Sequence, residues 1–459
     1  MAISVRALAA SALAELHRRQ SYSNIALDEL LKNASLGDAD RALLSRLFYG
    51  VIERRLTLDY AIGRCASTPI KKLHPLVRET LRVAMYQLLF MDRIPSAAAV
   101  NEAVSAVRAL KQGHASGFVN GVLRGFLRSK DTLFDALKDD DEGLSIRYSC
   151  PRELIAFWRE AYGAERLLPL LESLNGEAPE YIRVNPLKTT DELLEKRLVD
   201  LGITYEKSAD LPHCFRLNCA YLLNKLETDE KNCYYYQDIA SQWACFALGA
   251  QEGEHIADVC AAPGGKSFTT AQWMNNRGAV LSCDVYPQKC DAMQKRARQY
   301  GITILDTLVR DGRTAVPLSL EERFDRVICD VPCSGLGVIR RKPEIRYKPL
   351  ADFRELPELQ YAILERSARL VRVGGVLQYS TCTLNPAENE AVVQRFLKEH
   401  PEFSPRILPL DRCFEALGIP PTHHITLFPA VHGSDGFFIA GFIKNEVATY
   451  ADRHSITDK

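Results

Sequence analysis

Two cysteines directly follow predicted strands, where a reactive thiol would meet a ligand. Cys333 comes after the apolar stretch 326–331, and Cys382 comes after the stretch 376–380. In an open parallel sheet, ligands bind at the carboxyl ends of the strands. A thiolate there can add to an electron-poor ring carbon, so the pair predicts nucleophilic catalysis beside a bound ligand. The alternative is that each thiol is a small buried hydrophobe, the usual role of any one cysteine.

A loop with two glycines follows the predicted strand 255–259. It runs Cys260-Ala261-Ala262-Pro263-Gly264-Gly265-Lys266 and leads into a predicted helix. Glycines allow a backbone to approach a ligand closely, and the free N–H groups at a helix start favour an anionic group such as a carboxylate. The loop contains neither G-x-G-x-x-G nor G-x-x-x-x-G-K-[ST], which disfavours a dinucleotide or a triphosphate. A tight turn is the alternative role of each glycine.

An acidic residue ends the next predicted strand. Asp284 lies 19 residues past Gly265, the distance at which an acidic residue reaches a ribose hydroxyl pair in dinucleotide-binding folds. Together with the glycine loop, this spacing predicts a nucleoside ligand.

The elements that would position these residues alternate in type along the second half of the chain. Beyond residue 237, short apolar stretches alternate with helical ones, which is typical of a doubly wound parallel sheet. The predicted strands are 255–259, 279–285, 302–309, 326–331 and 376–380. Between 149 and 230 the pattern is α+β: helices at 152–162, 164–174 and 191–201 accompany extended segments at 181–185 and 203–205. A small β-α-β module is expected there.

The first 130 residues are predicted to form an all-α bundle. Apolar residues recur at helical spacing in 5–16, 43–52 (after a cap at Asp40), 74–91, 100–107 and 118–127. The acidic run 138–143 has no apolar period and ends in Gly143. It therefore indicates a linker and a domain boundary near 131–148.

Composition excludes several classes of protein. The chain has 459 residues, 47% of them hydrophobic and 25% charged, which is average for soluble multidomain proteins and excludes a disordered or collagen-like chain. No apolar run reaches the roughly 18 residues of a membrane helix, and Met1-Ala2-Ile3-Ser4-Val5-Arg6 lacks the pattern of a signal peptide, so we expect a cytoplasmic protein. The 13 cysteines are odd in number and form no C-x2-C pair, which disfavours structural disulfides and zinc.

Charge is unevenly distributed although the formal net charge is zero. Residues 1–130 carry 19 Lys+Arg against 10 Asp+Glu, a balance of +9 that the rest of the chain offsets. One end of the chain is therefore basic enough to meet a polyanion, and a solvated helical surface is the alternative.

Several motifs occur in one order along most of the chain. They are Gln237-Asp238-Ile239-Ala240-Ser241-Gln242, Ala261-Ala262-Pro263-Gly264-Gly265-Lys266, Asp311-Gly312-Arg313, Asp330-Val331-Pro332-Cys333-Ser334-Gly335, Ser380-Thr381-Cys382-Thr383 and Asp435-Gly436-Phe437-Phe438. The set resembles the S-adenosylmethionine-dependent RNA cytosine-5 methyltransferases of the NOL1/NOP2/Sun family. Residues 100–104 and 118–124 resemble the NusB-like domain of the bacterial members that modify 16S ribosomal RNA. Two departures, Ile239 for Glu and Val331 for Ala, carry no reacting group.

The resemblance implies a multidomain fold. Residues 1–140 are expected to form an all-α, NusB-like RNA-binding bundle, 149–230 a small α+β, RRM-like module, and 231–446 an α/β, Rossmann-like methyltransferase domain. The implied reaction transfers a methyl group from S-adenosyl-L-methionine to carbon 5 of a cytosine in 16S ribosomal RNA. A covalent adduct between a cysteine and carbon 6 of the base is its intermediate.

Catalytic roles also follow from the resemblance. Cys382 is expected to add to carbon 6 and Cys333 to assist release, while Asp330 contacts the cofactor or the base edge near ring nitrogen 3. Sequence alone leaves the two thiols interchangeable, because a Pro-Cys pair such as Pro332-Cys333 holds the nucleophile in DNA cytosine methyltransferases. Donation of a proton by Asp330 would require a raised carboxyl pKa.

Binding residues are implied in the same way. Cofactor contacts are expected from Cys260, Ala261, Ala262, Pro263, Gly264, Gly265, Lys266, Asp284, Asp311 and Asp330, with strand-end capping as the alternative for Asp284 and Asp311. Candidates for RNA phosphates, or else for exposed ion pairs, are Arg340, Arg341, Lys342 and Arg346. The expected partner is 16S ribosomal RNA, free or in an early assembly intermediate, with the cytosine in a loop or flipped out. No metal, membrane or obligate protein partner is implied.

Two rival functions remain at this point. The same chemistry could act on transfer RNA, against which the NusB-like front argues. A non-catalytic RNA-binding protein analogous to NusB is the second rival, and the presence of both cysteines with a complete cofactor loop argues against it.

Overall fold

The computed structural model describes residues 4–19, 23–33, 36–226 and 230–446, which fall into two compact units. The helical unit comprises Met1–Gly176 and Ile339–Leu350, and the sheet unit comprises Glu177–Val338 and Ala351–Lys459. The first three residues, on which part of the cytoplasmic expectation depends, lie outside the described residues.

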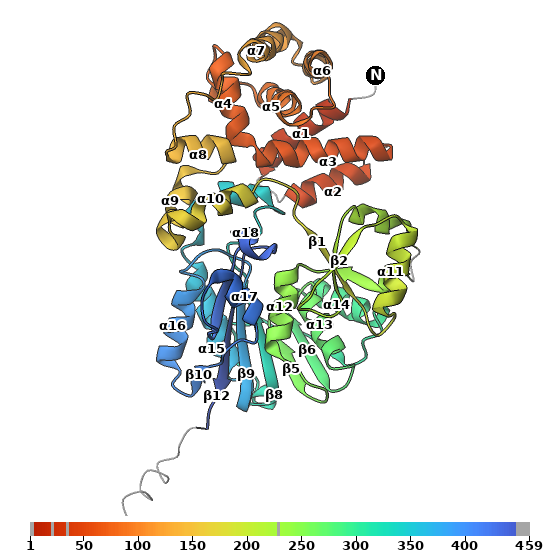
Figure 1. Ribbon diagram of the computed structural model, residues 1–459, viewed down its shortest axis with the longest axis vertical. Coiled ribbons are helices and arrows are strands. Elements are labelled where there is room, and N and C mark those ends of the chain that lie inside the picture. Colours follow the sequence, from red (N-terminus) through yellow and green to blue (C-terminus); the bar gives the residue numbers. More distant parts are fainter. Residues whose placement is uncertain (1–3, 20–22, 34–35, 227–229, 447–459) are drawn as a thin grey trace, which may run out of the picture. The chain divides into compact units, whose positions relative to one another are not determined.

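The helical unit confirms the all-α prediction (Figure 1). Its helices are α1 (Val5–Arg19), α2 (Ser23–Asn33), α3 (Asp38–Glu53), α4 (Arg55–Cys65), α5 (Pro75–Phe90), α6 (Ser96–Ala109), α7 (Ser116–Ser129), α8 (Asp141–Tyr148), α9 (Arg152–Tyr162) and α10 (Ala164–Ser173). The structure adds α2 and α4 to the predicted set, and it caps α3 at Gly37 rather than at Asp40.

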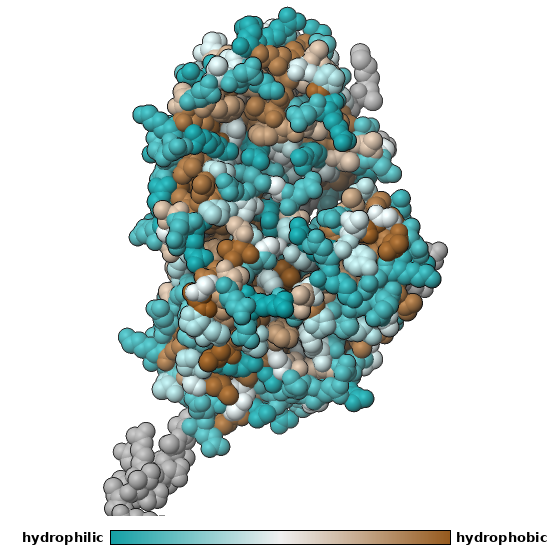
Figure 2. Space-filling view, in the orientation of Figure 1, coloured by the Kyte–Doolittle hydropathy of each residue, from teal (hydrophilic) through white to brown (hydrophobic). Residues whose placement is uncertain are grey.

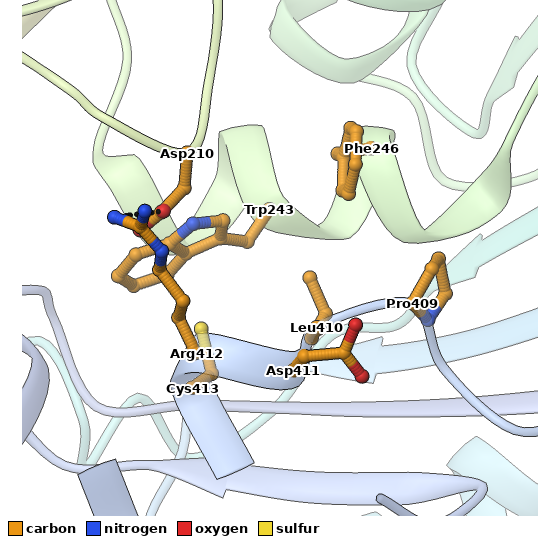
Figure 3. Close-up of a pocket in the computed structure, with 8 residues that line it drawn as sticks. All are labelled: Asp210, Trp243, Phe246, Pro409, Leu410, Asp411, Arg412 and Cys413. Atoms are coloured by element: carbon orange, nitrogen blue, oxygen red, sulfur yellow. Dashed lines mark ion pairs between the residues drawn. The ribbon is translucent and has the colours of Figure 1, made fainter. Parts of the chain in front are cut away.

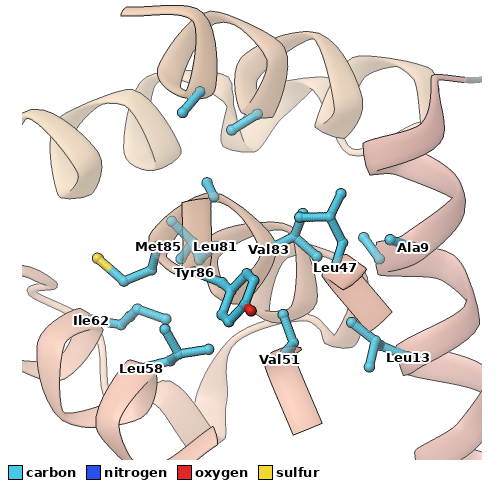
Figure 4. Packing of buried hydrophobic residues seen from close by; sticks show 14 of the residues in the cluster. Ala9, Leu13, Leu47, Val51, Leu58, Ile62, Leu81, Val83, Met85 and Tyr86 are labelled. Carbon is cyan, nitrogen blue, oxygen red and sulfur yellow. The ribbon is translucent and has the colours of Figure 1, made fainter. Parts of the chain in front are cut away.

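Helix α5 forms the centre of this unit. Its buried side chains lie on all sides of the helix from Val77 to Leu88, because α1, α3, α4, α6 and α7 all pack against it. Figure 4 shows Tyr86 of α5 among Leu58 of α4 and Val51 of α3. A helix that is buried on all sides is a core helix, so α5 holds the bundle together.

The acidic run 138–143 begins a helix, so the linker prediction is wrong here. The Asp140 side chain accepts a hydrogen bond from the Gly143 N–H at 2.9 Å and caps α8. Asp141 and Glu142 occupy the first turn, where carboxylates interact favourably with the helix dipole. Helix α8 packs against α4 and α9. The helices α8 to α10 therefore continue the helical unit, which extends to Gly176.

A small α+β module opens the sheet unit. It consists of β1 (Glu180–Val184), α11 (Asp191–Asp200), β2 (Tyr205–Lys207), β3 (Cys214–Leu217) and β4 (Tyr234–Tyr236), in the antiparallel order β2-β3-β1-β4. Ile182 and Val184 face α11 and pack with Leu194 and Leu198. Arg183, which lies between these two residues on the strand, is also buried. Side chains on both faces of β1 are thus covered.

The larger sheet positions the candidate chemistry. It runs β10-β12-β9-β8-β5-β6-β7, and β11 pairs with β12. The strands are β5 (His255–Asp258), β6 (Ala279–Asp284), β7 (Leu305–Val309), β8 (Phe324–Asp330), β9 (Val371–Thr381), β10 (Phe403–Pro405), β11 (His424–Leu427) and β12 (Phe437–Lys444). Strands β5 to β9 are parallel, as predicted. The sheet also contains β10, β11 and β12, which were not predicted, and β12 runs antiparallel to β9, β10 and β11.

Helices cover both faces of this sheet (Figure 1). They are α12 (Ile239–Leu248), α13 (Gly265–Trp273), α14 (Pro287–Gln299), α15 (Leu356–Ala368), α16 (Glu390–Glu399), α17 (Asp411–Leu417) and the short α18 (Pro429–His432). Side chains of α15 and α16 pack with one face, and side chains of α12, α13, α14 and α17 pack with the other. The strand ends between these layers are left to bind ligands.

Hydrophilic side chains interrupt the apolar ones across the face of the molecule in Figure 2. No helix among the described residues is long and apolar enough to cross a membrane.

Candidate active site

The parallel strands bring the two candidate cysteines together. Cys333 follows β8 and Cys382 follows β9, and Asp330, the last residue of β8, is the register partner of Ser380 near the end of β9. The two Sγ atoms lie 3.4 Å apart, neither thiol is in a disulfide, and both residues are half-buried. The pair therefore forms one site that a substrate atom can approach.

The ionisation of one thiol affects that of the other. The hydrogen bond with Cys382 raises the pKa of Cys333 well above the usual thiol value, and burial and the charge of Glu388 raise it further. Two like charges at this distance are unfavourable, so the pair holds at most one thiolate at neutral pH. The pair can therefore supply one thiolate while the other thiol stays protonated.

Asp330 accepts two hydrogen bonds beside the cysteines. Lys266 Nζ donates to its Oδ2 at 2.6 Å, and Ser380 Oγ donates to its Oδ1 at 2.7 Å. Burial lowers the pKa of Lys266, but the charge and the hydrogen bond of Asp330 raise it, and the net direction is upward. Lys266 therefore stays protonated and can act as a hydrogen-bond donor at this site.

The glycine loop turns sharply into α13. Gly264 has φ +105°, and a Cβ at this position would lie 2.4 Å from the Phe268 ring, so both backbone and space require glycine. Gly264 caps α13 without a side-chain hydrogen bond, which leaves the first N–H groups of the helix for an anionic ligand. Burial raises the pKa of Cys260 in this loop, so that thiol is unreactive.

Asp284 and Asp311 both cap their own loops. Asp284 Oδ1 accepts from the Tyr286 N–H at 3.0 Å. Asp311 accepts from the backbone N–H of Arg313 and from its guanidinium at 2.6 Å, and this hydrogen bond lowers the pKa of Asp311. Both oxygens of Asp311 accept hydrogen bonds from Arg313 of its own loop, which agrees with a capping role. Asp284 is therefore the stronger candidate for a ligand contact.

The donor set at these strand ends fits S-adenosylmethionine. A carboxylate ends β6 for the ribose hydroxyls, and the start of α13 offers N–H groups to the methionine carboxylate. Val285, Tyr286 and Val309 expose 48%, 55% and 50% of their surface beside Asp284 and β7, an apolar wall of the kind that a flat adenine ring covers. Among the described residues, no group of His, Cys, Asp or Glu is arranged to hold a metal ion.

The four basic candidates after the Cys333 loop separate into two kinds. Arg341 and Lys342 are exposed and Arg340 is half-buried. Arg346 is 1% exposed, and its guanidinium donates to backbone carbonyl oxygens of Glu53, Ser149 and Leu174 at 3.2–3.4 Å. The expectation of an RNA contact is therefore corrected for Arg346, because its donors are used inside the helical unit.

Residues that sequence reasoning missed lie beneath the cysteines and the cofactor loop. Glu388 is fully buried and accepts hydrogen bonds from Ser334 of the Cys333 loop. Asp258 is 1% exposed and accepts from Ser267 Oγ at 2.7 Å, and burial raises the pKa of Asp258 to about 7. The sequence offered one signal, the polar run Asn385-Pro386-Ala387-Glu388-Asn389-Glu390 directly after the Cys382 motif.

Residues outside the strand ends of the larger sheet hold helix α13 in place. Gln237 Oε1 accepts from Thr269 Oγ1 of α13 at 2.8 Å. On the face of β1 that points away from α11, Arg183 donates to Gln272 of α13 at 3.1 Å. Because α13 covers this face, the α+β module does not present it for stacking of RNA bases.

A separate pocket of about 160 Å³ lies between α12 and α17 (Figure 3). Trp243 and Phe246 line it from α12, and Arg412 forms an ion pair with Asp210 at 2.8 Å. Its only thiol, Cys413, is buried, which raises its pKa to about 12. The pocket shares no residue with the cysteine site and holds no nucleophile for the chemistry above.

Comparisons with known proteins cover nearly the whole chain. Residues 245–443 match the family described as 16S rRNA methyltransferase RsmB/F, residues 3–128 match the NusB family, and residues 150–223 match the ferredoxin-like domain of RsmF/B-like methyltransferases. The crystal structure of the protein PH0851 has the same fold, with a TM-score of 0.78, 27% identity, and coverage of 97% of this chain and 100% of that one.

Two curated proteins illustrate the similarity in sequence. The probable ribosomal RNA small subunit methyltransferase B of Bacillus subtilis (strain 168) is 35% identical over 445 residues, which are 96% of this chain and 99% of that protein. The ribosomal RNA small subunit methyltransferase B of Escherichia coli O1:K1 / APEC is 32% identical over 442 residues, 96% and 98% of the two chains.

Proposed function

Since this chain belongs to the RsmB/F family of 16S rRNA methyltransferases, we propose that it methylates carbon 5 of a cytosine in 16S rRNA through a covalent cysteine adduct. The observation that carries the proposal is the pair of thiols, 3.4 Å apart, at the carboxyl ends of β8 and β9. Carbon 5 of cytosine is a poor nucleophile, and a chemistry that adds one thiol and needs a second group for release explains why two stand together.

Cys382 is proposed as the nucleophile. Its thiolate forms a bond to carbon 6, and the electron pair of the C5–C6 double bond moves onto carbon 5, which then takes the methyl group. The position of Cys382 in the Ser380-Thr381-Cys382-Thr383 motif supports this choice, because the family resemblance gives the addition step to that cysteine. Lys266, held protonated by Asp330, is suited to stabilise the negative charge that builds on the base during addition.

Cys333 is proposed to assist release. When Cys382 has become a thioether, its charge no longer opposes ionisation of Cys333, and Cys333 can act as a base. It takes the proton from carbon 5, the C–H electron pair restores the C5–C6 double bond, and the bond between carbon 6 and Cys382 breaks. The unmodified Cys382 and the methylated base are the result.

S-adenosylmethionine supplies the methyl group when bound. Residues 260–266 are proposed to surround its methionine end, Asp284 to hold the ribose, and Asp330 to lie beside the methyl donor, with Asp311 as a lesser candidate at the adenine end. Arg340, Arg341 and Lys342 are proposed to contact RNA phosphates. The domain boundaries proposed for these tasks are 1–140, 149–230 and 231–446, although α9 and α10, at the start of the second range, belong to the helical unit.

Incubation of the protein with labelled S-adenosylmethionine and naked, unmodified 16S rRNA tests the proposal. We expect label in 16S rRNA, recovered as 5-methylcytidine by mass spectrometry of the nucleosides. Label in transfer RNA alone would move the protein to the rival substrate, and label on another atom of the base would reject the proposed chemistry.

A further inference from the structure

A buried carboxylate lies beneath both cysteine loops. Glu388 has no exposed surface and lies two residues before the start of α16, 6 residues after Cys382. Each of its oxygens accepts two hydrogen bonds. Oε1 accepts from Ser334 Oγ at 2.5 Å and from Asn385 Nδ2 at 2.8 Å, and Oε2 accepts from the Ser334 N–H at 2.9 Å and from Gln360 Nε2 at 2.7 Å. Both carboxylate oxygens therefore accept a hydrogen bond from Ser334 of the Cys333 loop.

These hydrogen bonds connect the two loops. Ser334 follows Cys333 directly, and its Oγ also lies 2.6 Å from Oγ1 of Thr383, which follows Cys382. The Gly337 N–H donates to the Cys382 carbonyl at 3.1 Å, in a space so narrow that a Cβ on Gly337 would lie 2.9 Å from that oxygen. Glu388 therefore binds Ser334, which follows Cys333, and Ser334 in turn contacts the strand end of Cys382 through Thr383.

None of the four donors to Glu388 carries a charge. A buried carboxylate without a cation is costly unless every hydrogen bond is well made, and such networks are rigid because each member is expensive to move. Rigidity is what a second thiol needs if it must reach carbon 5 after the first thiol has bonded to carbon 6 of the same ring.

We propose that Glu388 is a positioning residue that fixes Cys333 relative to Cys382 and thereby controls resolution of the covalent adduct. The proposal rests on the proposed function, because it concerns the step assigned to Cys333. Glu388 touches neither substrate nor cofactor in this assignment. It acts through Ser334, and loss of its carboxylate affects release more than addition.

The variant Glu388→Gln replaces one of the two carboxylate oxygens by an amide NH2 group, with little change in side-chain volume. A glutamine keeps one oxygen for two of the donors and turns its amide nitrogen toward the other two, for example toward the Ser334 N–H and Gln360 Nε2. Two donors that face a donor must separate, so the Cys333 loop shifts while Cys382, on its own strand, stays in place.

The test uses full-length protein, 16S rRNA and S-adenosylmethionine on a denaturing gel. We expect Glu388→Gln to accumulate a protein–RNA adduct at least about tenfold above wild type, the same behaviour that we expect of Cys333→Ala. Its affinity for S-adenosylhomocysteine should be unchanged within about twofold. Ser334→Ala, which keeps the backbone N–H but loses the hydroxyl bridge to Thr383, should accumulate a smaller amount. It also keeps the proposal testable if Glu388→Gln does not fold.

Glu390→Gln is the matched control. This neighbouring glutamate is half-buried and accepts a hydrogen bond from Thr426 at 2.9 Å, away from both cysteine loops. It should behave as wild type in the adduct assay.

Three results separate the possible failures. Parallel loss of methylation and adduct in Glu388→Gln, or equal accumulation in Glu390→Gln, would overturn the proposal in favour of a merely structural role. Faster resolution of the adduct in Glu388→Gln would also overturn the proposal. Loss of a negative charge near Cys333 lowers the pKa of Cys333, so faster release would mean that Cys333 is still correctly positioned without Glu388. Absence of adduct from Cys333→Ala itself would instead contradict the proposed function.

Discussion

At the residue scale, Asp284 combines a capping role with a proposed cofactor role, and the two can be separated. Asp284→Ala should weaken binding of S-adenosylhomocysteine by about tenfold or more, because hydrogen bonds from a charged group are worth about 1.5–3 kcal/mol. Asp284→Asn keeps an acceptor for the Tyr286 N–H and should lose less. Calorimetric titration measures both, and an unchanged dissociation constant for Asp284→Ala would remove this residue from the site.

Asp258 predicts a dependence of stability on pH. Its pKa is raised by burial from 3.8 to about 7, so the native state binds this proton more tightly than the unfolded state. Its contribution to stability is therefore complete below about pH 4 and is lost as the pH rises through 7.

The comparison with Asp258→Asn, which stays neutral, isolates this effect. Between pH 5 and pH 8 the free energy of unfolding of wild type should fall by about 2 kcal/mol relative to that of the variant. Urea unfolding at the two pH values provides the measurement. A constant difference between the two proteins would show that Asp258 is already ionised at pH 5.

Sequence reasoning found the reacting groups because their positions follow from strand order. Cys333 and Cys382 each follow an apolar stretch, and parallel strands place such residues at one edge of a sheet. It missed Glu388, because the partners of this carboxylate, among them Gln360, come from segments whose proximity only the folded chain defines. It also did not foresee that Lys266 pairs with Asp330.

At the element scale, the segment Ile339–Leu350 leaves the sheet unit and belongs to the helical unit. Arg346 binds backbone carbonyls there, so Arg346→Met should lower the free energy of unfolding by about 2–4 kcal/mol, since several buried acceptors lose a charged donor. Lys342→Ala, in the same segment but exposed, should change stability by less than about 0.5 kcal/mol. Thermal unfolding compares them. Equal stability of Arg346→Met and wild type, together with weaker RNA binding, would restore Arg346 as a phosphate ligand.

Elements were predictable where a period or a cap determines them, and not where direction matters. The strand β12 is buried along nearly its whole length, and a continuous apolar run indicates a buried strand without indicating whether it runs parallel or antiparallel to its neighbours. The start of α8 was missed for the opposite reason. Its acidic residues resemble a linker in composition, and only the hydrogen bond from Gly143 to Asp140 identifies them as a cap.

At the scale of the whole molecule, the zero net charge conceals a basic end that we propose binds RNA. Arg124 and Arg128 lie one turn apart on α7 and are exposed, as is Lys130 just beyond it. Changing these three residues to glutamine in the full-length protein should weaken binding to 16S rRNA and reduce the slope of log affinity against log salt by about 0.7–0.9 for each phosphate contact removed. Deletion of residues 1–130 is a poorer test, because the Glu53 carbonyl that Arg346 binds would be lost with them.

The variant with Arg124→Lys and Arg128→Lys is the control that keeps the charge. It should retain most of the affinity and the salt slope of wild type, and all these proteins should bind S-adenosylhomocysteine equally. An unchanged salt slope in the glutamine variant would exclude this surface from RNA binding and leave it as a solvated helical face.

The most direct test of the account is a denaturing gel of Cys382→Ala and Cys333→Ala, each incubated with labelled 16S rRNA and S-adenosylmethionine. Cys382→Ala should give neither methylation nor adduct, because the bond to carbon 6 cannot form. Cys333→Ala should accumulate a denaturation-resistant protein–RNA complex that carries the transferred methyl group, because addition proceeds and release is slow. An adduct from Cys382→Ala with none from Cys333→Ala would contradict the account and place the nucleophile in the Pro332-Cys333 pair.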